Sequence, residues 1–440
     1  MDPIQLALWA FPVLLGLIFM GVPIALAMMA VGLVGSYLIF GAIDPLLSQL
    51  NIMAYSQFSS HSLSIIALFL LMGQLASVGG MSKALFKAAE TFIGHRKGGL
   101  AMAAIGACGG FGAVCGSSLA TAATMGQVAL PELRRAGYDP GLATGALAAG
   151  GTLGILIPPS IVLVIYAILA EQNIAVLFAA AMVPGILAAL GYMAVISIRV
   201  QLDPSLAGDM PPASWRERWS ALINIWPVAL IFLVVIGGIY LGIFTPTEGA
   251  AVGVATTALL AWLRGGITRQ SLRSIILSTA SGTAMVFFIV LGAAAFNTFL
   301  ALSQLPQELA NWVGTLQVNP YAILTAILVL YLILGCVMDS LSMILLTVPI
   351  LFPVVIGLDF GMTPDQTAIW FGVLVLIVVE VGLITPPVGM NLFIIQAMAP
   401  DIPVQATYRG VMPFLLADIL RVALLMALPS ITLWLPSLIT

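Results

Sequence analysis

Long apolar stretches, separated by short polar turns, make up most of this 440-residue chain. A helix needs about 20 apolar residues to cross the hydrocarbon core of a bilayer. The pattern therefore predicts a series of membrane-spanning helices, in which two segments contain a break and two are closely spaced helix pairs. The predicted segments are 4–20, 23–42, 60–79, a pair at 98–131, 140–170 with a break, 173–198, 222–242, 246–263, 275–301, a pair at 320–357, 366–398 with a break, and 410–435.

The composition agrees with a membrane protein. Hydrophobic residues make up 61% of the chain and charged residues 7%, whereas a soluble domain carries roughly 25% charged residues. We therefore expect an all-α polytopic membrane protein. The first apolar segment lacks a basic flank, so we interpret it as a span and not as a cleaved signal peptide. The net charge of −3 says little about partners, and we expect no nucleic acid among them.

Basic residues indicate the orientation, because cytoplasmic loops of membrane proteins are enriched in Lys and Arg. Twelve of the fourteen basic residues fall into four clusters. An even number of predicted crossings separates each pair of clusters, provided that each broken segment crosses once. We therefore place the clusters in the cytoplasm and the N-terminus on the outside. The clusters span 83–97, 134–135, 199–218 and 264–273.

Two double prolines interrupt apolar segments. Pro158-Pro159 lies in "GGTLGILIPPSI" (150–161), and Pro386-Pro387 lies in "EVGLITPPVGMN" (380–391). Proline removes a backbone donor and clashes with the preceding helical turn, and an unsatisfied backbone group in hydrocarbon costs several kcal/mol. We expect each pair to end a half-helix whose carbonyl groups face a cavity. The alternative is a proline kink in a continuous helix.

The two helix pairs are predicted to be re-entrant hairpins. Residues 98–133 number 36 between flanking basic pairs, which is short for two crossings and a turn, and the middle is rich in small and polar residues. Non-helical backbone at this depth is tolerated only inside protein or along a cavity. Two tightly packed spans are the alternative for the first pair, and the second pair, 320–357, is interpreted as a hairpin by symmetry alone.

The second half of the chain repeats features of the first half in the same order. Three residues of the first half match three of the second: Pro23 matches Pro246, Ser118 matches Ser340, and Pro158 matches Pro386. The paired residues are 223, 222 and 228 positions apart. The orientation rule places the two copies upside down relative to each other. Inverted repeats with interrupted helices are typical of secondary transporters with a midplane site. We divide the chain into a first repeat (1–198), a cytoplasmic linker (199–221) and a second repeat (222–440).

The hairpin turns and breaks hold the candidate site. A hard cation such as Na⁺ takes oxygen ligands, and half-helix N-termini suit a carboxylate substrate. A membrane serine often bonds its own helix instead. Glu380 is an intramembrane acid with either a functional role or a structural role as acceptor for loose backbone donors. The candidate Na⁺ ligands are Ser117, Ser118, Thr121, Thr152, Gly154, Asp339, Ser340, Ser342, Thr385 and Pro386, and the candidate substrate residues are Gly116, Pro158, Pro159, Pro387, Gly389 and Asn391.

The residues that ATP hydrolysis or a catalytic site would need are absent from the sequence. The sequence contains no GxxxxGK[ST] motif for ATP and no HExxH motif for zinc. His61 and His95 are interpreted as surface residues, so "CGSS" (115–118) has no histidine to activate a serine. The cysteines at 108 and 115 are interpreted as packing residues. We therefore expect a transporter without ATP and not an enzyme, with an intramembrane hydrolase or a structural scaffold as distant alternatives.

Four strings together resemble the large membrane subunit of tripartite ATP-independent periplasmic (TRAP) transporters, the DctM type. They are "GAVCGSSLATAATMGQVALPELRRAGYDPGLATG", "GGTLGILIPPSI", "GIFTPTEGAAVG" and "VGLITPPVGMNLF". The likeness covers essentially the whole chain. It places the hairpin tips at Gly116–Ser118 and Asp339–Ser340, the unwound breaks at Gly154–Pro159 and Thr385–Gly389, and arm helices at 81–95 and 305–316.

The resemblance also implies a function. Members of this family take up organic acids across the bacterial inner membrane, driven by a Na⁺ gradient, with an elevator-type movement. A periplasmic substrate-binding protein and a small four-helix membrane subunit are the expected partners. The alternative within the same broad architecture is an ion-coupled dicarboxylate transporter that needs no binding protein.

Overall fold

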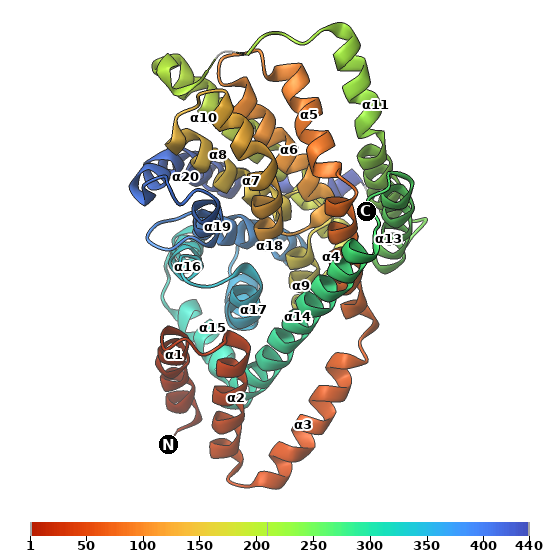
Figure 1. The fold of residues 1–440 in the computed structure, drawn as a ribbon. Helices are drawn as coiled ribbons and strands as arrows, with labels where there is room; N and C mark the ends of the chain where they lie inside the picture. The colour runs from red at the N-terminus through yellow and green to blue at the C-terminus, as the bar shows by residue number, and fades with distance from the viewer. Residues whose placement is uncertain (1, 209, 439–440) are drawn as a thin grey trace.

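The computed structural model describes residues 2–208 and 210–438, and the described chain is helical throughout, without strands (Figure 1). This confirms the predicted fold class. Among the described residues, six helices are long and apolar enough to cross a membrane, or seven when α8 and α9 count as one span. The helices of the first half are α1 (Pro3–Phe19), α2 (Ile24–Phe40), α3 (Ile43–Phe58), α4 (Ser64–Val78), α5 (Met81–Ile93), α6 (Gly99–Cys115), α7 (Ser118–Arg135), α8 (Pro140–Leu156), α9 (Ile161–Leu169) and α10 (Ile174–Leu202).

The second half begins with α11, after a connection at 203–214. Both ends of the predicted linker 199–221 are helical, because α10 runs on to Leu202 and α11 starts at Trp215. The helices are α11 (Trp215–Phe232), which continues through a π-helical stretch (Leu233–Gly237) into α12 (Gly238–Tyr240), then α13 (Pro246–Leu263), α14 (Arg269–Ser303), α15 (Leu305–Thr315), α16 (Pro320–Gly335), α17 (Ser340–Ile356), α18 (Pro364–Gly382), α19 (Met390–Met398), α20 (Val404–Ala427) and α21 (Pro429–Leu433).

The predicted segments follow the order of these helices, with one omission and one division: the last segment, predicted as a single span at 410–435, contains the end of α20 and the separate α21. Helix α3 occupies 43–58, where we predicted only a connection. The same succession of elements occurs twice: a short amphipathic helix, a hairpin of two helices, and a helix pair interrupted by a break. These are α5 to α9 in the first half and α15 to α19 in the second. The predicted inversion of the second copy across the membrane stays a prediction.

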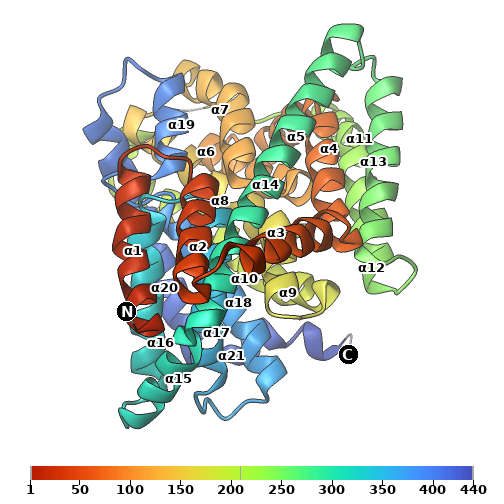
Figure 2. The ribbon, with the colours of Figure 1, turned by 90° about the horizontal axis from the view of Figure 1, so that it is seen from below.

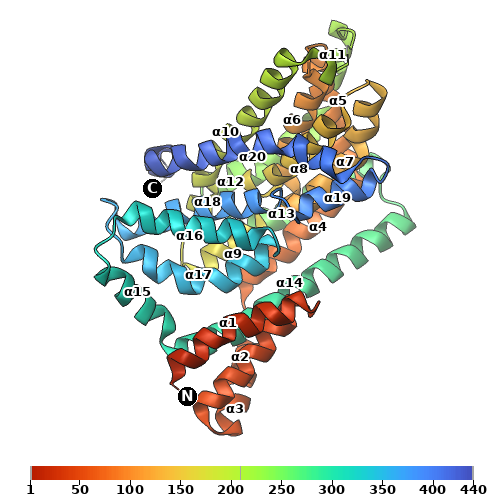
Figure 3. The same cartoon turned by 90° about the vertical axis from the view of Figure 1, so that its left-hand side faces the viewer.

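Helix α14 separates two groups of helices. It runs diagonally through the molecule, with α1, α2 and α3 on one side and α16 and α17 on the other (Figures 1 and 3). Seen from below, α11, α12 and α13 form an outer edge beside α4 and α5 (Figure 2). The first helices of the two broken pairs lie in the interior: α8 is buried from Gly141 to Leu156 and α18 from Thr367 to Gly382.

Small residues allow α2 and α14 to pack closely. A Cβ atom added to Gly32 would lie 2.6 Å from the main chain of Ala295, and one added to Gly35 would meet the Phe299 ring. Glycine at position 32 therefore lets the two helix backbones approach closely, and glycine at position 35 leaves room for the Phe299 ring. This contact connects the N-terminal helices to α14.

We expect Gly32→Ala to lower the free energy of unfolding by about 1–3 kcal/mol, because the added methyl overlaps backbone that cannot rotate away. The measurement is thermal unfolding of the purified chain in detergent. Gly16→Ala in α1 is the matched control, since its Cβ would have no atom within 4 Å, and the better helix propensity of Ala makes it neutral or slightly stabilising. Equal melting temperatures for the two variants would contradict the close packing.

Candidate transport site

Each hairpin turn ends in a capped helix N-terminus. Gly116 has a left-handed backbone conformation (φ 66°) after α6, and the Ser117 hydroxyl accepts a bond of 3.4 Å from the Ala120 N–H. In the second hairpin, the Asp339 carboxylate accepts a bond of 3.1 Å from the Ser342 N–H. Oxygen side chains at this position satisfy the free N–H groups of the first turn. Both turns therefore present the positive end of a helix dipole inside the protein.

Both predicted breaks are present. Helix α8 ends at Leu156 and α9 begins at Ile161, at an angle of 46°. Helix α18 ends at Gly382, and α19 begins only at Met390. The Pro158-Pro159 and Pro386-Pro387 peptide bonds are both cis. The alternative of a kink in a continuous helix is therefore wrong at both places.

Each hairpin turn lies against the break of its own half. A Cβ atom on Gly116 would come 3.0 Å from the Pro159 carbonyl oxygen, and one on Gly154 would come 2.7 Å from the Ser117 carbonyl oxygen. In the second half, the Gly389 N–H donates to the Cys336 carbonyl at 3.4 Å. The structure thus brings turn and break together twice, as the sequence predicts.

Glu380 connects the two hairpins. Its Oε1 atom accepts a hydrogen bond of 2.8 Å from the Ser340 hydroxyl and a longer one, 3.5 Å, from the Ser118 hydroxyl. Its bonding partners are therefore hydroxyl groups and not the loose backbone donors of our structural interpretation. Asn391 adds a second bridge between the halves, because its Nδ2 donates to the Ala148 carbonyl of α8 at 3.4 Å. Residues of the two repeats therefore meet at Glu380 and at Asn391.

Several oxygen atoms in this region are short of partners. Glu380 Oε2 and Asn391 Oδ1 are buried without a hydrogen-bond partner among the described residues, and Thr121 Oγ1 has only the weak Cys115 thiol beside it. An unpaired buried acceptor is costly unless a ligand or water meets it. Within residues 2–208 and 210–438, no group of three His, Cys, Asp or Glu side chains could hold a metal ion. The available donors are therefore hydroxyl, amide, carboxylate and main-chain oxygens, which suit a hard cation.

Other predicted ligands are already bonded within the protein. The Thr385 hydroxyl donates to the Val381 carbonyl at 2.6 Å, which is the helix self-bonding that we weighed for such residues. The Ser342 hydroxyl donates to Asp339 at 2.5 Å. Thr152 faces α10, since its hydroxyl lies 2.7 Å from the Ala149 carbonyl and 3.0 Å from the Tyr192 hydroxyl.

The remaining predicted residues line the breaks or a neighbouring cavity. The Pro387 carbonyl accepts a bond of 2.5 Å from the Tyr408 hydroxyl, and Pro158 is buried in the first break. Asp339 also borders a cavity of about 370 Å³ that the α1–α2 turn and α14 share, with Val22 and Phe288 among its lining residues. The tip of the second hairpin therefore faces the N-terminal helices.

Sequence reasoning missed a buried polar network behind α8. Asp418 Oδ2 accepts a bond of 2.8 Å from the Tyr192 hydroxyl, and Asp418 Oδ1 lies 2.8 Å from Arg421 Nη2. Both charged side chains are buried, with 1% and 7% of their surface exposed. The available signal was an acid and a base three residues apart in an apolar span, a spacing that places them on one helix face. The network connects α20 through Tyr192 to Thr152.

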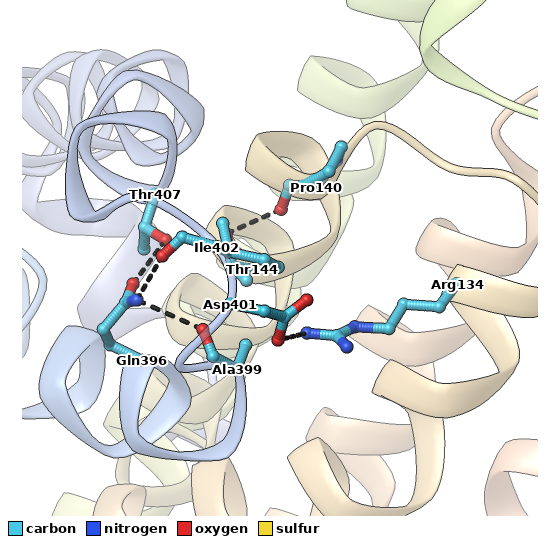
Figure 4. A network of polar contacts seen from close by, with 8 residues as sticks. All are labelled: Arg134, Pro140, Thr144, Gln396, Ala399, Asp401, Ile402 and Thr407. Carbon is cyan, nitrogen blue, oxygen red and sulfur yellow. Dashed lines mark hydrogen bonds and ion pairs between the residues drawn. The ribbon is translucent and has the colours of Figure 1, made fainter.

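A second network joins the halves at one end of the molecule (Figure 4). Arg134, at the end of α7, donates to Asp401 between α19 and α20 at 2.9 Å, and this hydrogen bond holds the pKa of the Asp401 carboxyl below its usual value. Beside it, Gln396 donates to the Ile402 carbonyl at 2.5 Å and accepts from the Thr407 hydroxyl at 2.9 Å. An exposed ion pair contributes little stability, so its main effect is to set the position of the turn before α20.

A multi-pass helical chain with two hairpin turns packed against two broken helices has the architecture of a membrane permease. Residues 11–431 match the family model described as "Tripartite ATP-independent periplasmic transporter, DctM component". The chain therefore belongs to the DctM family of TRAP transporters, as its motifs suggested. Its relatives are named as permeases, so it is a transporter and not an enzyme.

Three known proteins illustrate the similarity. The chain is 37% identical to the C4-dicarboxylate TRAP transporter large permease protein DctM of Pseudomonas aeruginosa, over 88% of this chain and 89% of that protein. It is 33% identical to the sialic acid TRAP transporter large permease protein SiaM of Vibrio cholerae, over 96% and 97%. The crystal structure of the YdaH transporter of Alcanivorax borkumensis superposes with a TM-score of 0.67 at 16% identity, covering 97% of this chain and 98% of the other, which shows a shared fold.

We expect Gly154→Ala to displace the first hairpin turn from α8, because the added methyl would overlap the Ser117 carbonyl. The expected result is faster hydrogen–deuterium exchange at residues 116–121 and a free energy of unfolding lower by about 1–3 kcal/mol. Gly106→Ala on α6 is the control, since its Cβ would meet only the flexible end of Met193 at 3.2 Å. Unchanged exchange at the turn in Gly154→Ala would contradict the contact between turn and break.

Proposed function

We propose that the chain is the large permease subunit of a TRAP transporter that takes up an organic acid together with Na⁺. The observation that carries this proposal is the meeting of two capped helix N-termini with two helix breaks, around buried oxygens that lack partners. Family membership gives the tripartite transporter class, whereas the ion, the substrate and the partners belong to the proposal.

Oxygen atoms at each turn and break support one cation site per half. The first half offers Thr121 Oγ1 together with the Ser117 carbonyl, both next to Gly154. The second half offers the carboxylate of Asp339 and the hydroxyl of Ser340. Sodium is a hard cation without strong geometric demands, so mixed carbonyl and hydroxyl ligands suit it better than they suit a transition metal.

Helix dipoles support a carboxylate substrate. The N-termini of α7, α9, α17 and α19 all belong to the hairpins and breaks, and such ends attract anions. A Lys or Arg is not needed for this attraction, and the buried Arg421 is already paired with Asp418. The two relatives described above are named for a C4-dicarboxylate and for sialic acid, and both compounds are carboxylic acids.

The remaining parts of the proposal come from the family's tripartite organisation. A periplasmic substrate-binding protein would deliver the organic acid, and a small four-helix membrane subunit would accompany this chain in the bacterial inner membrane. The N-terminus would lie in the periplasm, as the distribution of basic residues predicts. An elevator-type movement would carry the two hairpins and broken helices against the remaining helices.

The proposal is tested by uptake into proteoliposomes that contain this chain and the small subunit, with the binding protein outside. Succinate and sialic acid are the first substrates to try. We expect uptake to stop when the Na⁺ gradient is removed, because the ion gradient is the energy source. Uptake that is unaffected by its removal would refute the coupling, and uptake by the purified chain alone would favour the carboxylate transporter without a binding protein.

We expect Ser118→Ala and Asp339→Asn each to raise the Na⁺ concentration for half-maximal uptake by about fivefold to tenfold. Each change weakens or removes an oxygen at a hairpin turn, and a hydrogen bond or ligand of this kind contributes about 1–1.5 kcal/mol. The measurement is the Na⁺ dependence of the initial uptake rate. Ser205→Ala, in the exposed connection between α10 and α11, should leave it unchanged, and wild-type values in both site variants would exclude these two residues from the ion sites.

A further inference from the structure

We propose that Glu380 is a positioning residue that ties the two hairpin turns together, so that a cation bound at one turn affects binding at the other. This inference rests on the proposed Na⁺ coupling and adds to it a physical link between the two ion sites. Glu380 lies on α18, three residues before the second break at Leu383, and is 0% exposed.

The arrangement of the two serines around this carboxylate carries the inference. Ser118 and Ser340 are the first residues of α7 and α17. They belong to different halves of the chain, yet both hydroxyls donate to the same atom, Oε1. The second oxygen, Oε2, remains buried without a partner in the described part of the chain. A carboxylate that only satisfied two buried hydroxyls could accept one hydrogen bond at each of its two oxygens. Because both serines bond the same oxygen, Oε1, the position of each turn depends on the position of the other.

The shared acceptor also sets the direction of the hydroxyl groups. A serine hydroxyl has one proton and two lone pairs. When the proton of each serine is directed at Glu380, the lone pairs of both oxygens point away from α18 and are available to a cation. A partner that orients a ligand in this way commonly changes metal affinity by tenfold or more when it is removed. A shift of one turn moves the shared oxygen and so reorients the hydroxyl of the other turn.

A double-mutant cycle tests this link, because residues that share a partner give non-additive effects whereas independent residues do not. The measurement is the Na⁺ concentration that gives half of the maximal stabilisation of the purified full-length chain against thermal unfolding. The variants are Ser118→Ala, Ser340→Ala and the double variant. We expect the double variant to depart from the product of the two single fold-changes by about threefold or more.

The same cycle in two Glu380 backgrounds identifies the connecting atom. Glu380→Met keeps the side-chain volume but has no oxygen, so we expect the serine effects to become multiplicative. Glu380→Gln keeps a carbonyl oxygen that accepts both hydroxyls, so we expect the coupling to survive. Loss of coupling in Glu380→Gln would overturn the role of Oε1. Coupling that persists in Glu380→Met would also overturn it, and would mean that both serines hold one ion.

Ser117→Ala and Ser342→Ala form the matched control pair. They lie next to the two test serines but bond elsewhere, to the Ala120 N–H and to Asp339. Their effects should multiply in every background. Multiplicative effects of Ser118→Ala and Ser340→Ala in the wild-type chain would overturn the inference without any Glu380 variant, even if Glu380→Met does not fold.

Failure of the proposed function gives a different result. If Na⁺ does not stabilise the wild-type chain at all, the proposed Na⁺ coupling is refuted. The same double-mutant cycle is then measured through the free energy of unfolding in potassium buffer. Coupling between the two serines that disappears in the Glu380→Met background would still support the link between the turns. Additive effects in that buffer refute the tie as well.

Discussion

The cost of an unpaired backbone group in hydrocarbon governs the arrangement of this molecule. Each break frees main-chain groups, and inside a membrane such groups persist only when protein or a polar cavity surrounds them. The helices that lead into the two breaks are accordingly deeply enclosed: α8 and α18 are buried along nearly their whole length. Small residues make the enclosure possible, since Gly154 leaves room for the Ser117 carbonyl at the first turn. The hairpin turns therefore pack over the breaks.

Convergence of the two halves follows from the same constraint. A helix N-terminus inside the protein needs oxygen acceptors, and each turn supplies its own cap, Ser117 or Asp339. The next residue of each helix, Ser118 or Ser340, then reaches the carboxylate of Glu380. Carbonyl and hydroxyl oxygens, helix N-termini and two acids, Asp339 and Glu380, thus lie around the turns and breaks. Such a region can accept a cation and an anion together more readily than either one alone, because each offsets the charge of the other.

The sequence predicts the features that depend on local chemistry, and it misses the contacts between residues that lie far apart in the chain. Pro158-Pro159 and Pro386-Pro387 reveal the breaks because proline cannot continue a helix, whereas the re-entrance inferred from the length of 98–133 stays a prediction. Helix α3 was missed because its polar residues, Gln49 among them, interrupt the apolar run that marks a span. The sharing of Glu380 by two serines was out of reach, since Ser118 lies 262 positions from it, and no local pattern reports such a pairing.

Contacts between the halves indicate which elements behave as one body. Asn391 bonds Ala148, Arg134 bonds Asp401, and the Tyr166 hydroxyl donates to the Ala368 carbonyl at 2.6 Å. These bonds join the hairpins and broken helices of both repeats directly. By contrast, a cavity of about 790 Å³ lies between α3 and α14 on one side and α9 and α17 on the other, and its walls include the amides of Gln49 and Asn297. A loosely filled boundary costs less to shear than a closely packed, interlocked one. If the predicted elevator movement occurs, sliding along this boundary breaks little packing at the cavity, and Glu380 lies inside the body that would move.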